Sequence, residues 1–179
     1  MQRIAVVGPC GAGKSTLARR LGARTGLPVT HLDALFWLPG WKESRPEEFD
    51  AKLTVVAAGE RWIIEGNYAR TLPIRLARAE AVIIVDAPRV TCVWRAFTRA
   101  VKNLGRVRPD LAPGCPEKID LNFLWWAWRH HAEQLDKVHA ALAGAPVANP
   151  ARTVIHLRSA RDARALMRRL TADSPTRAP

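Results

Sequence analysis

A glycine-rich segment near the start of the chain carries the residues with the clearest chemistry. Residues 8–16 read GPCGAGKST and match the pattern G-x-x-x-x-G-K-S. Glycines at this spacing let backbone N–H groups turn toward an anion, while a following helix, a lysine and a serine supply positive charge and a Mg²⁺ ligand. The segment therefore predicts a site for the phosphates of ATP together with Mg²⁺. Its predicted ligands are Gly8, Gly11, Ala12, Gly13, Lys14, Ser15 and Thr16.

The residues on either side of this segment provide the context that the motif requires. Residues 3–7 are typical of a buried strand, and the apolar spacing up to about residue 21 is typical of a helix. A plain glycine turn that packs a helix on a strand would leave Lys14 without a purpose. Lys14 is therefore predicted to be catalytic and to reach the β and γ phosphates, while Ser15 holds Mg²⁺. Cys10 is interpreted as a small side chain in the loop rather than as a redox sensor.

A second segment, HLDALFWLPGW over residues 31–41, places one carboxylate beside three large aromatic side chains. It follows a short predicted strand at residues 28–32, so Asp33 is expected where that strand ends. Asp33 is predicted to accept hydrogen bonds from an acceptor hydroxyl or to help position Mg²⁺. Trp37 and Trp41 are predicted either to stack on a planar or apolar acceptor or to pack a short helix against the core. Phe36 is expected in the core.

Strand and helix patterns alternate along the rest of the chain. Strands are predicted at residues 62–65, 81–85 and 153–157, and helices at 44–59, 71–79, from 89, from 121 and from 159. Ser44 and Glu47 have the spacing of a capping box, and Gly59 is the expected stop of that helix. The alternation predicts an α/β fold with a parallel sheet, helices on both faces, and ligands at the carboxyl ends of the strands.

Two acidic residues at strand ends compete for the role of the Mg²⁺ ligand. Glu65 ends the predicted strand at residues 62–65, and Asp86 follows the predicted strand at residues 81–85. Glu65 is preferred because its strand is expected beside the phosphate-binding strand, where an acid holds Mg²⁺ through water. Asp86 stays the alternative ligand, with a purely structural role at the strand end as its other interpretation.

A basic stretch without an acidic residue separates Asp86 from Asp110. Apolar residues between 90 and 104 repeat at helical spacing and are expected to pack, with basic residues on another face. Residues 105–116 are interpreted as a mobile loop. Phosphoryl transfer needs positive charge over the transferring group, so this stretch predicts an arginine lid, with a solvated basic face as the alternative. Its basic residues are Arg89, Arg95, Arg99, Lys102, Arg106 and Arg108, of which Arg99, Arg106 and Arg108 are predicted to be catalytic.

The overall composition limits the class of protein. The chain has 179 residues, 48% of them hydrophobic and 25% charged, and a formal net charge of +12. These values indicate one folded domain whose charge attracts the phosphates of a nucleotide or a nucleic acid. Three cysteines without a C-x-x-C pair indicate neither a disulfide framework nor a zinc site, and a reducing cytoplasm is expected. Apolar runs are no longer than a strand and no signal peptide is evident, so no membrane partner is predicted.

Six segments, taken in order, give the chain a resemblance to a known family: GPCGAGKST, HLDALFWLPGW, WIIEGNY, VDAPR, GRVRPDLAPGCPEK and LWWAW. They span residues 8–128 and resemble the FlaR-related topology-modulation proteins, within the adenylate-kinase-like group of nucleoside monophosphate kinases. The resemblance implies a three-layer P-loop NTPase fold with a five-stranded parallel sheet of order 2-3-1-4-5. It also implies an acceptor site after the second and third strands, and an arginine-bearing lid after the fourth, at about residues 99–118.

The implied acceptor site includes the segment after the third strand. Adenylate kinases carry Asp-Gly-Phe-Pro-Arg there, whereas this chain reads EGNYAR over residues 65–70, which argues against AMP itself as the acceptor. Arg70 is predicted either to clamp an acceptor phosphate or to be a solvated arginine. The predicted substrate-binding residues are Asp33, Trp37, Trp41, Glu65, Asn67, Tyr68 and Arg70.

These observations lead to one hypothesis and one rival. The hypothesis is a Mg²⁺-dependent phosphotransferase that holds ATP on residues 8–16, with its base near Arg158 and Ser159, and passes the γ-phosphate to a small acceptor such as a nucleotide or nucleoside. The rival is a nucleic-acid-associated NTPase that binds DNA through arginines of the lid and the last helix, and nucleic acid is the less favoured partner. A single domain is predicted over residues 1–170, followed by a disordered tail at 171–179.

Overall fold

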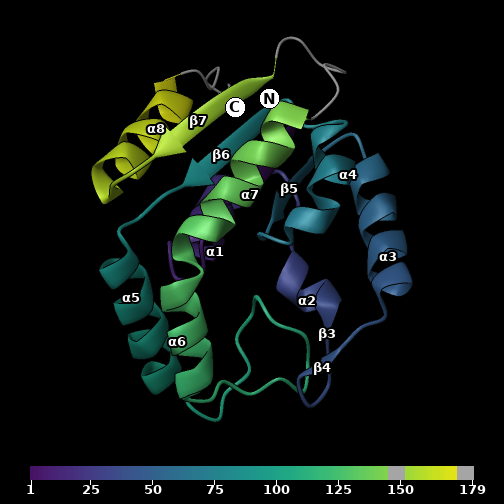
Figure 1. The fold of residues 1–179 in the computed structure, drawn as a ribbon. Helices are drawn as coiled ribbons and strands as arrows, with labels where there is room; N and C mark the ends of the chain where they lie inside the picture. Colours follow the sequence, from purple (N-terminus) through teal and green to yellow (C-terminus); the bar gives the residue numbers. More distant parts are fainter. Residues whose placement is uncertain (145–151, 173–179) are drawn as a thin grey trace, which may run out of the picture.

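A parallel sheet of five strands forms the centre of the molecule (Figure 1). The computed structural model describes residues 1–144 and 152–172, so most of the predicted tail lies outside the described residues. The strand order is β2-β5-β1-β6-β7, which is the predicted order 2-3-1-4-5 when the strands of this sheet are counted along the chain. The strands are β2 (Val29–His31), β5 (Trp62–Glu65), β1 (Arg3–Val7), β6 (Ala81–Val85) and β7 (Thr153–Leu157).

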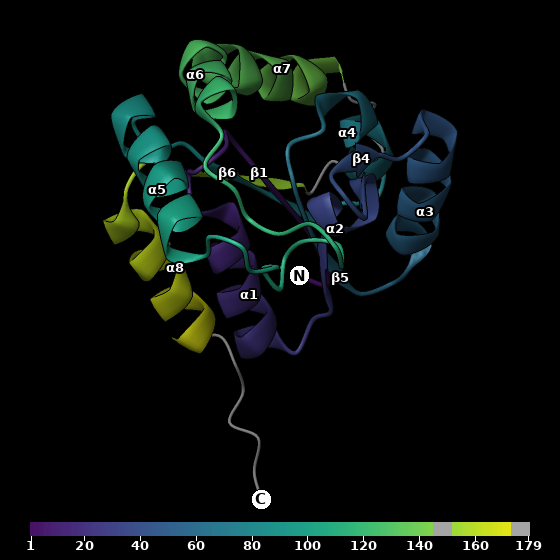
Figure 2. The same ribbon diagram turned by 90° about the horizontal axis from the view of Figure 1, so that it is seen from below.

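The three inner strands are continuous apolar runs because helices cover both faces of the sheet. Successive side chains of a strand point to opposite faces, and β1 shows this directly. Val6 belongs to the core beneath α1 (Lys14–Thr25) and α8 (Ala160–Ala172). Ala5 and Val7 belong to the core on the other face. That face is covered by α3 (Pro46–Ala58), α4 (Leu72–Leu76) and α7 (His131–Gly144), and Figure 2 shows the two sets of helices on opposite sides of the sheet.

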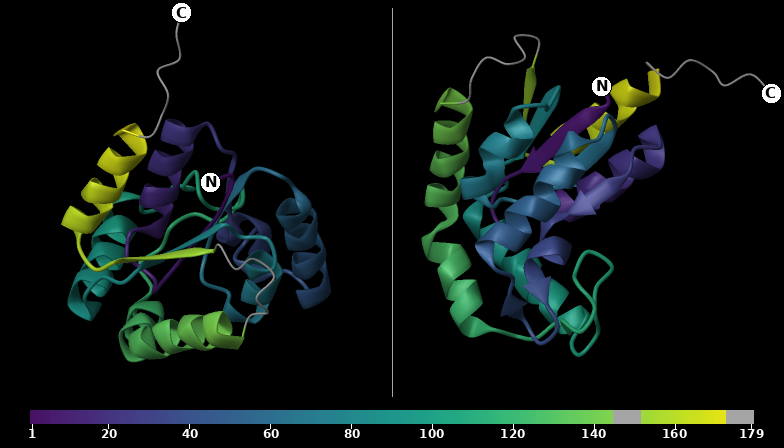
Figure 3. Two further views of the ribbon diagram at one scale, coloured as in Figure 1. Left: turned by 90° about the horizontal axis from the view of Figure 1, so that it is seen from above. Right: turned by 90° about the vertical axis from the view of Figure 1, so that its right-hand side faces the viewer.

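Two helices and a long loop extend beyond the carboxyl ends of the strands. Helix α5 (Arg89–Lys102) is followed by an irregular segment that folds back on itself through isolated bridges between Leu104 and Glu117 and between Val107 and Pro116. This segment is the region predicted as a lid. Helix α6 (Leu121–Arg129) then leads into α7 past a single residue, so the two helices run on from one another as a bent rod (Figure 3).

The segment after β2 forms a short helix and a hairpin. Helix α2 (Leu32–Phe36) is followed by strands β3 (Trp37–Leu38) and β4 (Lys42–Glu43), which pair antiparallel. The turn between them has positive φ at Gly40 and at Trp41, whose φ of 61° is uncommon for a residue with a side chain. After β5, the 3₁₀ turn η1 (Ala69–Thr71) leads into α4.

Two local predictions were wrong. Ser44 does not cap α3: the helix starts at Pro46 with Arg45 as its N-cap residue, and the buried Ser44 hydroxyl has no hydrogen-bond partner among the described residues. Proline at the first helical position has no N–H to satisfy, so the helix starts there without a side-chain cap. In α5 the predicted apolar face is largely exposed, with Val90 and Trp94 at 65% and 63%. The buried face consists of Cys92, Ala96 and Ala100.

Candidate active site

The glycine-rich segment joins β1 to α1 and forms a tight loop, as the pattern predicts. Gly8, Gly11 and Gly13 all have positive φ, at 136°, 76° and 104°. A Cβ atom at Gly8 would overlap the carbonyl oxygen of Val85, and one at Gly11 would overlap that of Cys92. Gly8 and Gly11 are therefore required for two reasons: their backbone conformation favours glycine, and a side chain would block the close approach to β6 and α5.

The amino end of α1 leaves several backbone N–H groups free for an anion. Its N-cap residue, Gly13, has no side chain to cap the helix, and the first N–H groups of any helix lack intrahelical partners. The ammonium group of Lys14 lies across the loop, where it donates a hydrogen bond to the Pro9 carbonyl at 2.9 Å. Unpaired N–H groups, the helix dipole and a lysine together form a phosphate site.

Glu65 ends β5 beside this loop and receives contacts from both sides of the site. Its carboxylate lies 2.8 Å from Nδ1 of His31, and the nearby Ser15 hydroxyl helps to lower its pKa. Burial acts to raise the pKa of Glu65, but the bond with His31 and the charge of Lys14 outweigh it and hold this pKa below its usual value. The ionised carboxylate and the Ser15 hydroxyl are hard oxygen ligands, which fit Mg²⁺.

Strand adjacency does not decide between the two candidate acids, because β1 pairs with β5 on one side and with β6 on the other. Their electrostatic surroundings differ. The charge of Lys14 helps to lower the pKa of Glu65, whereas Asp86 helps to raise the pKa of the Cys92 thiol.

Asp33 lies in the first turn of α2, two positions after the N-cap residue His31, and the charges of Glu65 and Lys14 act on it. The Tyr68 hydroxyl donates a hydrogen bond to its Oδ1 at 2.8 Å. Burial and the charge of Glu65 raise the pKa of Asp33, and the Tyr68 bond and Lys14 only partly oppose them. A carboxyl with a raised pKa is suited to accept a proton from a hydroxyl.

Aromatic side chains surround this carboxyl. The ring of Phe36 lies 4.9 Å from that of Tyr68 and 5.3 Å from that of Phe49, so it belongs to the core as predicted. The rings of Trp37 and Trp41 meet edge to face at 5.4 Å, and both side chains remain partly exposed. The two tryptophans therefore keep part of their surface exposed.

The loop after α5 rests on the β3–β4 hairpin. The Gly40 N–H donates to the Gly114 carbonyl at 2.8 Å, and the Trp41 indole N–H donates to the Pro116 carbonyl at 2.8 Å. The second bond directs the Trp41 indole toward the loop. These two bonds hold the loop against the β3–β4 hairpin.

The arginines of the predicted lid differ in their environments. Arg108 is buried and forms ion pairs with Asp110, at 2.8 Å, and with Glu117. Arg99 lies 3.8 Å from Glu117 and acts electrostatically on Cys10 of the phosphate loop. The ion pairs with Asp110 and Glu117 hold Arg108 inside the loop. The sequence did not indicate this pairing. Arg106 is exposed.

Arg95, on α5, contacts the phosphate loop directly. Its Nη1 donates a hydrogen bond to the Ala12 carbonyl at 3.1 Å and lies beside Gly13. Among the described lid-region arginines it is the one that hydrogen-bonds to the phosphate loop, although Arg99, Arg106 and Arg108 were the ones predicted to be catalytic. The absence of acidic residues in this stretch was the signal that pointed to it.

Two further predicted residues have specific partners. Arg70 forms a bidentate pair with Asp50 of α3, at 2.6 and 2.7 Å, and its side chain is 59% exposed. It is therefore paired with an acid of α3 at the surface. Arg158 is exposed at the end of β7, where its N–H donates to Asp162. Ser159 does cap α8, since its hydroxyl accepts from the Asp162 N–H at 3.2 Å.

Arg75 supports the loop after β5, residues 66–68, and the sequence did not indicate this role. It is fully buried and donates hydrogen bonds to the carbonyls of Gly66, Asn67 and Tyr68 at 2.8, 3.0 and 3.3 Å. Burial lowers its pKa to about 10, and the charge of Glu65 opposes this shift. Arg75 lies three positions after Leu72 and shares the buried face of α4 with it. An arginine on an otherwise apolar helix face was the feature of the sequence that could have indicated a buried structural role.

Gln134 of α7 was also missed, and it links the two halves of the site. Its Oε1 accepts hydrogen bonds from the Cys10 N–H at 3.3 Å and from the Asn67 amide at 3.2 Å. The other polar atoms of the two amides, Gln134 Nε2 and Asn67 Oδ1, are buried without partners among the described residues. Buried polar atoms of this kind usually have a partner, so both are available to a bound ligand.

Three solved structures share this fold along nearly the whole chain. A shikimate kinase from Acinetobacter baumannii, in complex with shikimate, has a TM-score of 0.56 and 17% identity and covers 96% of this chain and 91% of its own. A gluconokinase from Sinorhizobium meliloti 1021 has a TM-score of 0.52, 16% identity, and coverage of 96% and 94%. A shikimate kinase from Aquifex aeolicus vf5 has a TM-score of 0.51, 13% identity, and coverage of 95% and 94%. No protein-family model and no curated protein sequence matches the chain.

These likenesses define the class of fold. The chain has the three-layer α/β fold of small P-loop kinases, with the phosphate loop between β1 and α1. This confirms the predicted kinase-like fold, whereas the resemblance to topology-modulation proteins rests on the six sequence segments alone.

Proposed function

We propose that this protein is a Mg²⁺-dependent phosphotransferase that moves the γ-phosphate of ATP to a hydroxyl of a small acceptor. One observation carries the proposal: Gln134 Oε1 accepts from the Cys10 N–H of the phosphate loop and from the Asn67 amide, and the next residue, Tyr68, donates to Asp33. A phosphate site and a carboxyl suited to bind a hydroxyl therefore belong to one hydrogen-bonded cluster. Positioning two substrates in such a cluster supplies much of the catalysis in phosphoryl transfer.

The phosphate side of the reaction uses the loop, Lys14 and two oxygen ligands. Backbone N–H groups of residues 8–16 bind the β and γ phosphates of ATP, and Lys14 neutralises part of their charge. Ser15 and Glu65 are the residues that fit Mg²⁺, which when bound spreads the negative charge of the phosphates. The adenine base is expected near Arg158, where β7 ends.

The acceptor side uses Asp33 and its neighbours. The acceptor hydroxyl donates a hydrogen bond to Asp33, which Tyr68 holds in place. The hydroxyl oxygen bonds to the γ-phosphorus, the bond to the oxygen bridging to the β-phosphate breaks, and the released proton passes to Asp33. ADP and the phosphorylated acceptor leave when the loop after α5 lifts from the hairpin at Gly40. Lid arginines, of which Arg99 and Arg106 are candidates, offset charge on the transferring group.

The acceptor class proposed first is nucleosides and nucleotides, since Trp37 and Trp41 keep partly exposed rings that can stack on a planar base. The net charge of +12 favours a second candidate, a nucleic-acid-stimulated NTPase that uses the same loop. The two functions share the ATP site and differ in what receives the phosphate.

A panel of acceptors separates these functions. Purified protein is incubated with ATP, Mg²⁺ and one nucleoside, nucleotide, sugar or hydroxy acid at a time, and ADP release is measured together with the mass of the product. Acceptor-dependent ADP release with a product heavier by one phosphoryl group supports the phosphotransferase. ADP release that requires single- or double-stranded DNA, with free phosphate as the product, supports the rival. The matched control is Lys14→Ala, which is expected to abolish either activity.

A further inference from the structure

A surface away from the phosphate loop exposes an unusual number of large apolar side chains. On α5, Val90 is 65% and Trp94 63% exposed, and on α6, Leu121 is 72% and Trp125 60% exposed. Trp128 completes the set at 37%. We refer to these five residues as the tryptophan face. Single exposed apolar residues are ordinary, but a contiguous group of this size marks an interaction surface.

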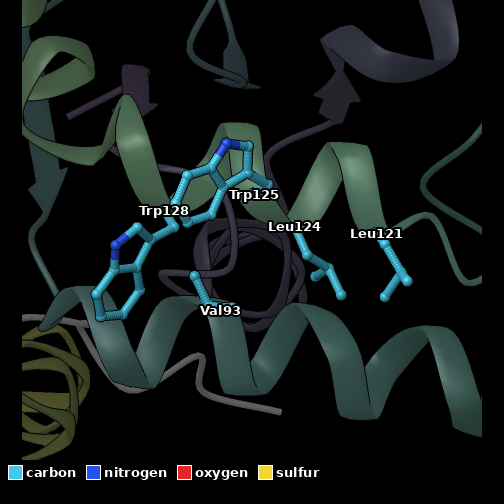
Figure 4. Close-up of a pocket in the computed structure, with 5 residues that line it drawn as sticks. All are labelled: Val93, Leu121, Leu124, Trp125 and Trp128. Atoms are coloured by element: carbon cyan, nitrogen blue, oxygen red, sulfur yellow. The ribbon is translucent and has the colours of Figure 1, made fainter.

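A groove between the two helices includes three members of this face, Leu121, Trp125 and Trp128. It is lined by side chains from α6 and by Val93 of α5 (Figure 4). Figure 4 shows Leu121 and Leu124 pointing from α6 toward α5, with the indole of Trp128 at the other end of the groove. All five lining residues, Val93, Leu121, Leu124, Trp125 and Trp128, are apolar apart from the indole N–H groups. The groove therefore offers apolar area and almost no hydrogen-bonding specificity.

The charge around the face is positive. Arg89 lies over the ring of Trp128 at 5.3 Å and Arg129 over that of Trp125 at 5.8 Å. Lys102 is exposed at the end of α5, and Arg106 is exposed in the loop that follows this helix. Cations over the tryptophan rings give a surface that combines apolar area with positive charge.

The acids of this region do not neutralise that charge. Between residues 87 and 132 the acidic residues are Asp110, Glu117 and Asp120. Asp110 and Glu117 are buried and paired with Arg108. Asp120 accepts the Phe123 N–H at the start of α6 and lies 3.7 Å from Lys118. The exposed cations beside the tryptophan face are therefore left for an external anion.

We propose that the tryptophan face docks on the surface of a membrane that contains anionic phospholipids. Tryptophan settles at the level of lipid headgroups, aliphatic side chains enter the outer hydrocarbon region, and arginine and lysine bind headgroup phosphates. Such a contact lies in the plane of the membrane and needs no spanning helix. None of the described helices has the length and apolarity to cross a bilayer, and the earlier expectation of no membrane partner was based on spanning segments alone.

Charge and composition favour lipid over the other occupants. A second copy of the chain would bring Arg89 and Arg129 of each copy toward those of the other, since a two-fold interface joins identical surfaces. A single-stranded nucleic acid would suit the cations and indoles, but it stacks on aromatic rings and gains little from Val90 or Leu121. An anionic bilayer matches the aliphatic, aromatic and basic side chains together.

The test is flotation of the full-length protein with vesicles of phosphatidylcholine alone, or with about one third phosphatidylglycerol. We expect the protein to float with the anionic vesicles and to remain in solution with the neutral ones. The double variant W94S/W125S changes exposed residues only and is expected to lower binding to anionic vesicles by about tenfold or more. R89Q/R129Q is expected to lower it by about thirtyfold, since each cation near an anionic surface contributes about fivefold. V55S alters a valine that is 75% exposed on α3 and serves as the control expected to bind like wild type.

Three results would overturn the proposal. The first is the absence of binding to anionic vesicles, or equal binding to neutral ones. The second is a concentration-dependent dimer in light scattering that W94S/W125S abolishes, which assigns the face to a second copy. The third is binding of a single-stranded oligonucleotide that depends on the same tryptophans. Flotation requires no ATP turnover, so its outcome is independent of the proposed phosphotransferase activity.

Discussion

Replacing Arg75 by methionine tests whether a buried guanidinium holds the loop after β5, residues 66–68, in place. The Arg75 side chain is fully buried and donates to three backbone carbonyls, those of Gly66, Asn67 and Tyr68. Methionine fills much of the same volume but leaves these carbonyls without their donor. A hydrogen bond to a charged group contributes about 1.5–3 kcal/mol, so three of them contribute about 5–9 kcal/mol before the cost of burial is considered.

Burying the charge offsets part of this gain. Burial lowers the pKa of Arg75 to about 10, well below the usual value for arginine. At about 1.36 kcal/mol for each pKa unit, this corresponds to a penalty of about 3 kcal/mol that methionine does not incur. The net expectation is that Arg75→Met lowers the free energy of unfolding by about 2–6 kcal/mol.

The assay is urea unfolding followed by circular dichroism, with Arg70→Met as the matched control. Arg70 is paired with Asp50, but its side chain is 59% exposed, so its loss is expected to cost about 0–1 kcal/mol. Arg75→Lys keeps the charge and one donor group, and it is expected to fold while raising the KM for the acceptor more than that for ATP. The reasoning is refuted if Arg75→Met destabilises the protein no more than Arg70→Met does.

Three further predictions concern single side chains of the site. In the wild type, kcat is expected to fall as the pH drops through the pKa of Asp33, which burial holds above its usual value, because the protonated carboxyl cannot accept a proton. Asp33→Asn should lower kcat by about 10²–10⁴ and remove this pH dependence. A pH profile that Asp33→Asn leaves unchanged would contradict the proposed role. Gly11→Ala places a Cβ on the Cys92 carbonyl at a positive φ, so calorimetry should show MgATP binding weaker by about tenfold or more, and wild-type affinity would show that the tight approach is not needed. Gln134→Leu removes the hydrogen-bond acceptor that the phosphate loop and the loop after β5 share. The KM for both substrates should rise, and Gln134→Glu should retain more function. An effect on the KM of one substrate alone would contradict the proposed link.

The sheet and the phosphate loop could be predicted because local patterns determine them. Continuous apolar runs such as residues 81–85 suit strands covered on both faces, and the spacing of Gly8, Gly13 and Lys14 matches a loop that needs glycine and a cation. The strand order followed from the family resemblance, and the structure has that order.

The packing of α5 could not be predicted from periodicity. Large apolar residues such as Val90 and Trp94 repeat at helical spacing, and the pattern predicted that they pack. The structure instead buries Cys92, Ala96 and Ala100, whose small side chains let the α5 backbone approach Gly11 closely. Apolar periodicity identifies the helix, but the size of the side chains determines which face can pack at short range.

The polar network of the site depends on contacts between distant segments. Gln134 is separated from Cys10 by 124 positions, and Trp41 from Pro116 by 75, so no local pattern pairs them. The two acids that bind Arg108 follow it within the same loop, yet their pairing depends on how that loop folds back. Buried polar partners are fixed by the whole fold, which is why they appear only in the structure.

Titration of a non-hydrolysable MgATP analogue into the wild-type protein and Lys14→Ala, followed by a crystal structure of the complex, tests the central claim most directly. We expect the analogue to bind the wild type, with its phosphates against the backbone of residues 8–16 and Mg²⁺ between Ser15 and Glu65. Lys14→Ala is expected to lose most of this affinity. Equal affinity of the two proteins, or a triphosphate bound elsewhere with the loop empty, would contradict the account.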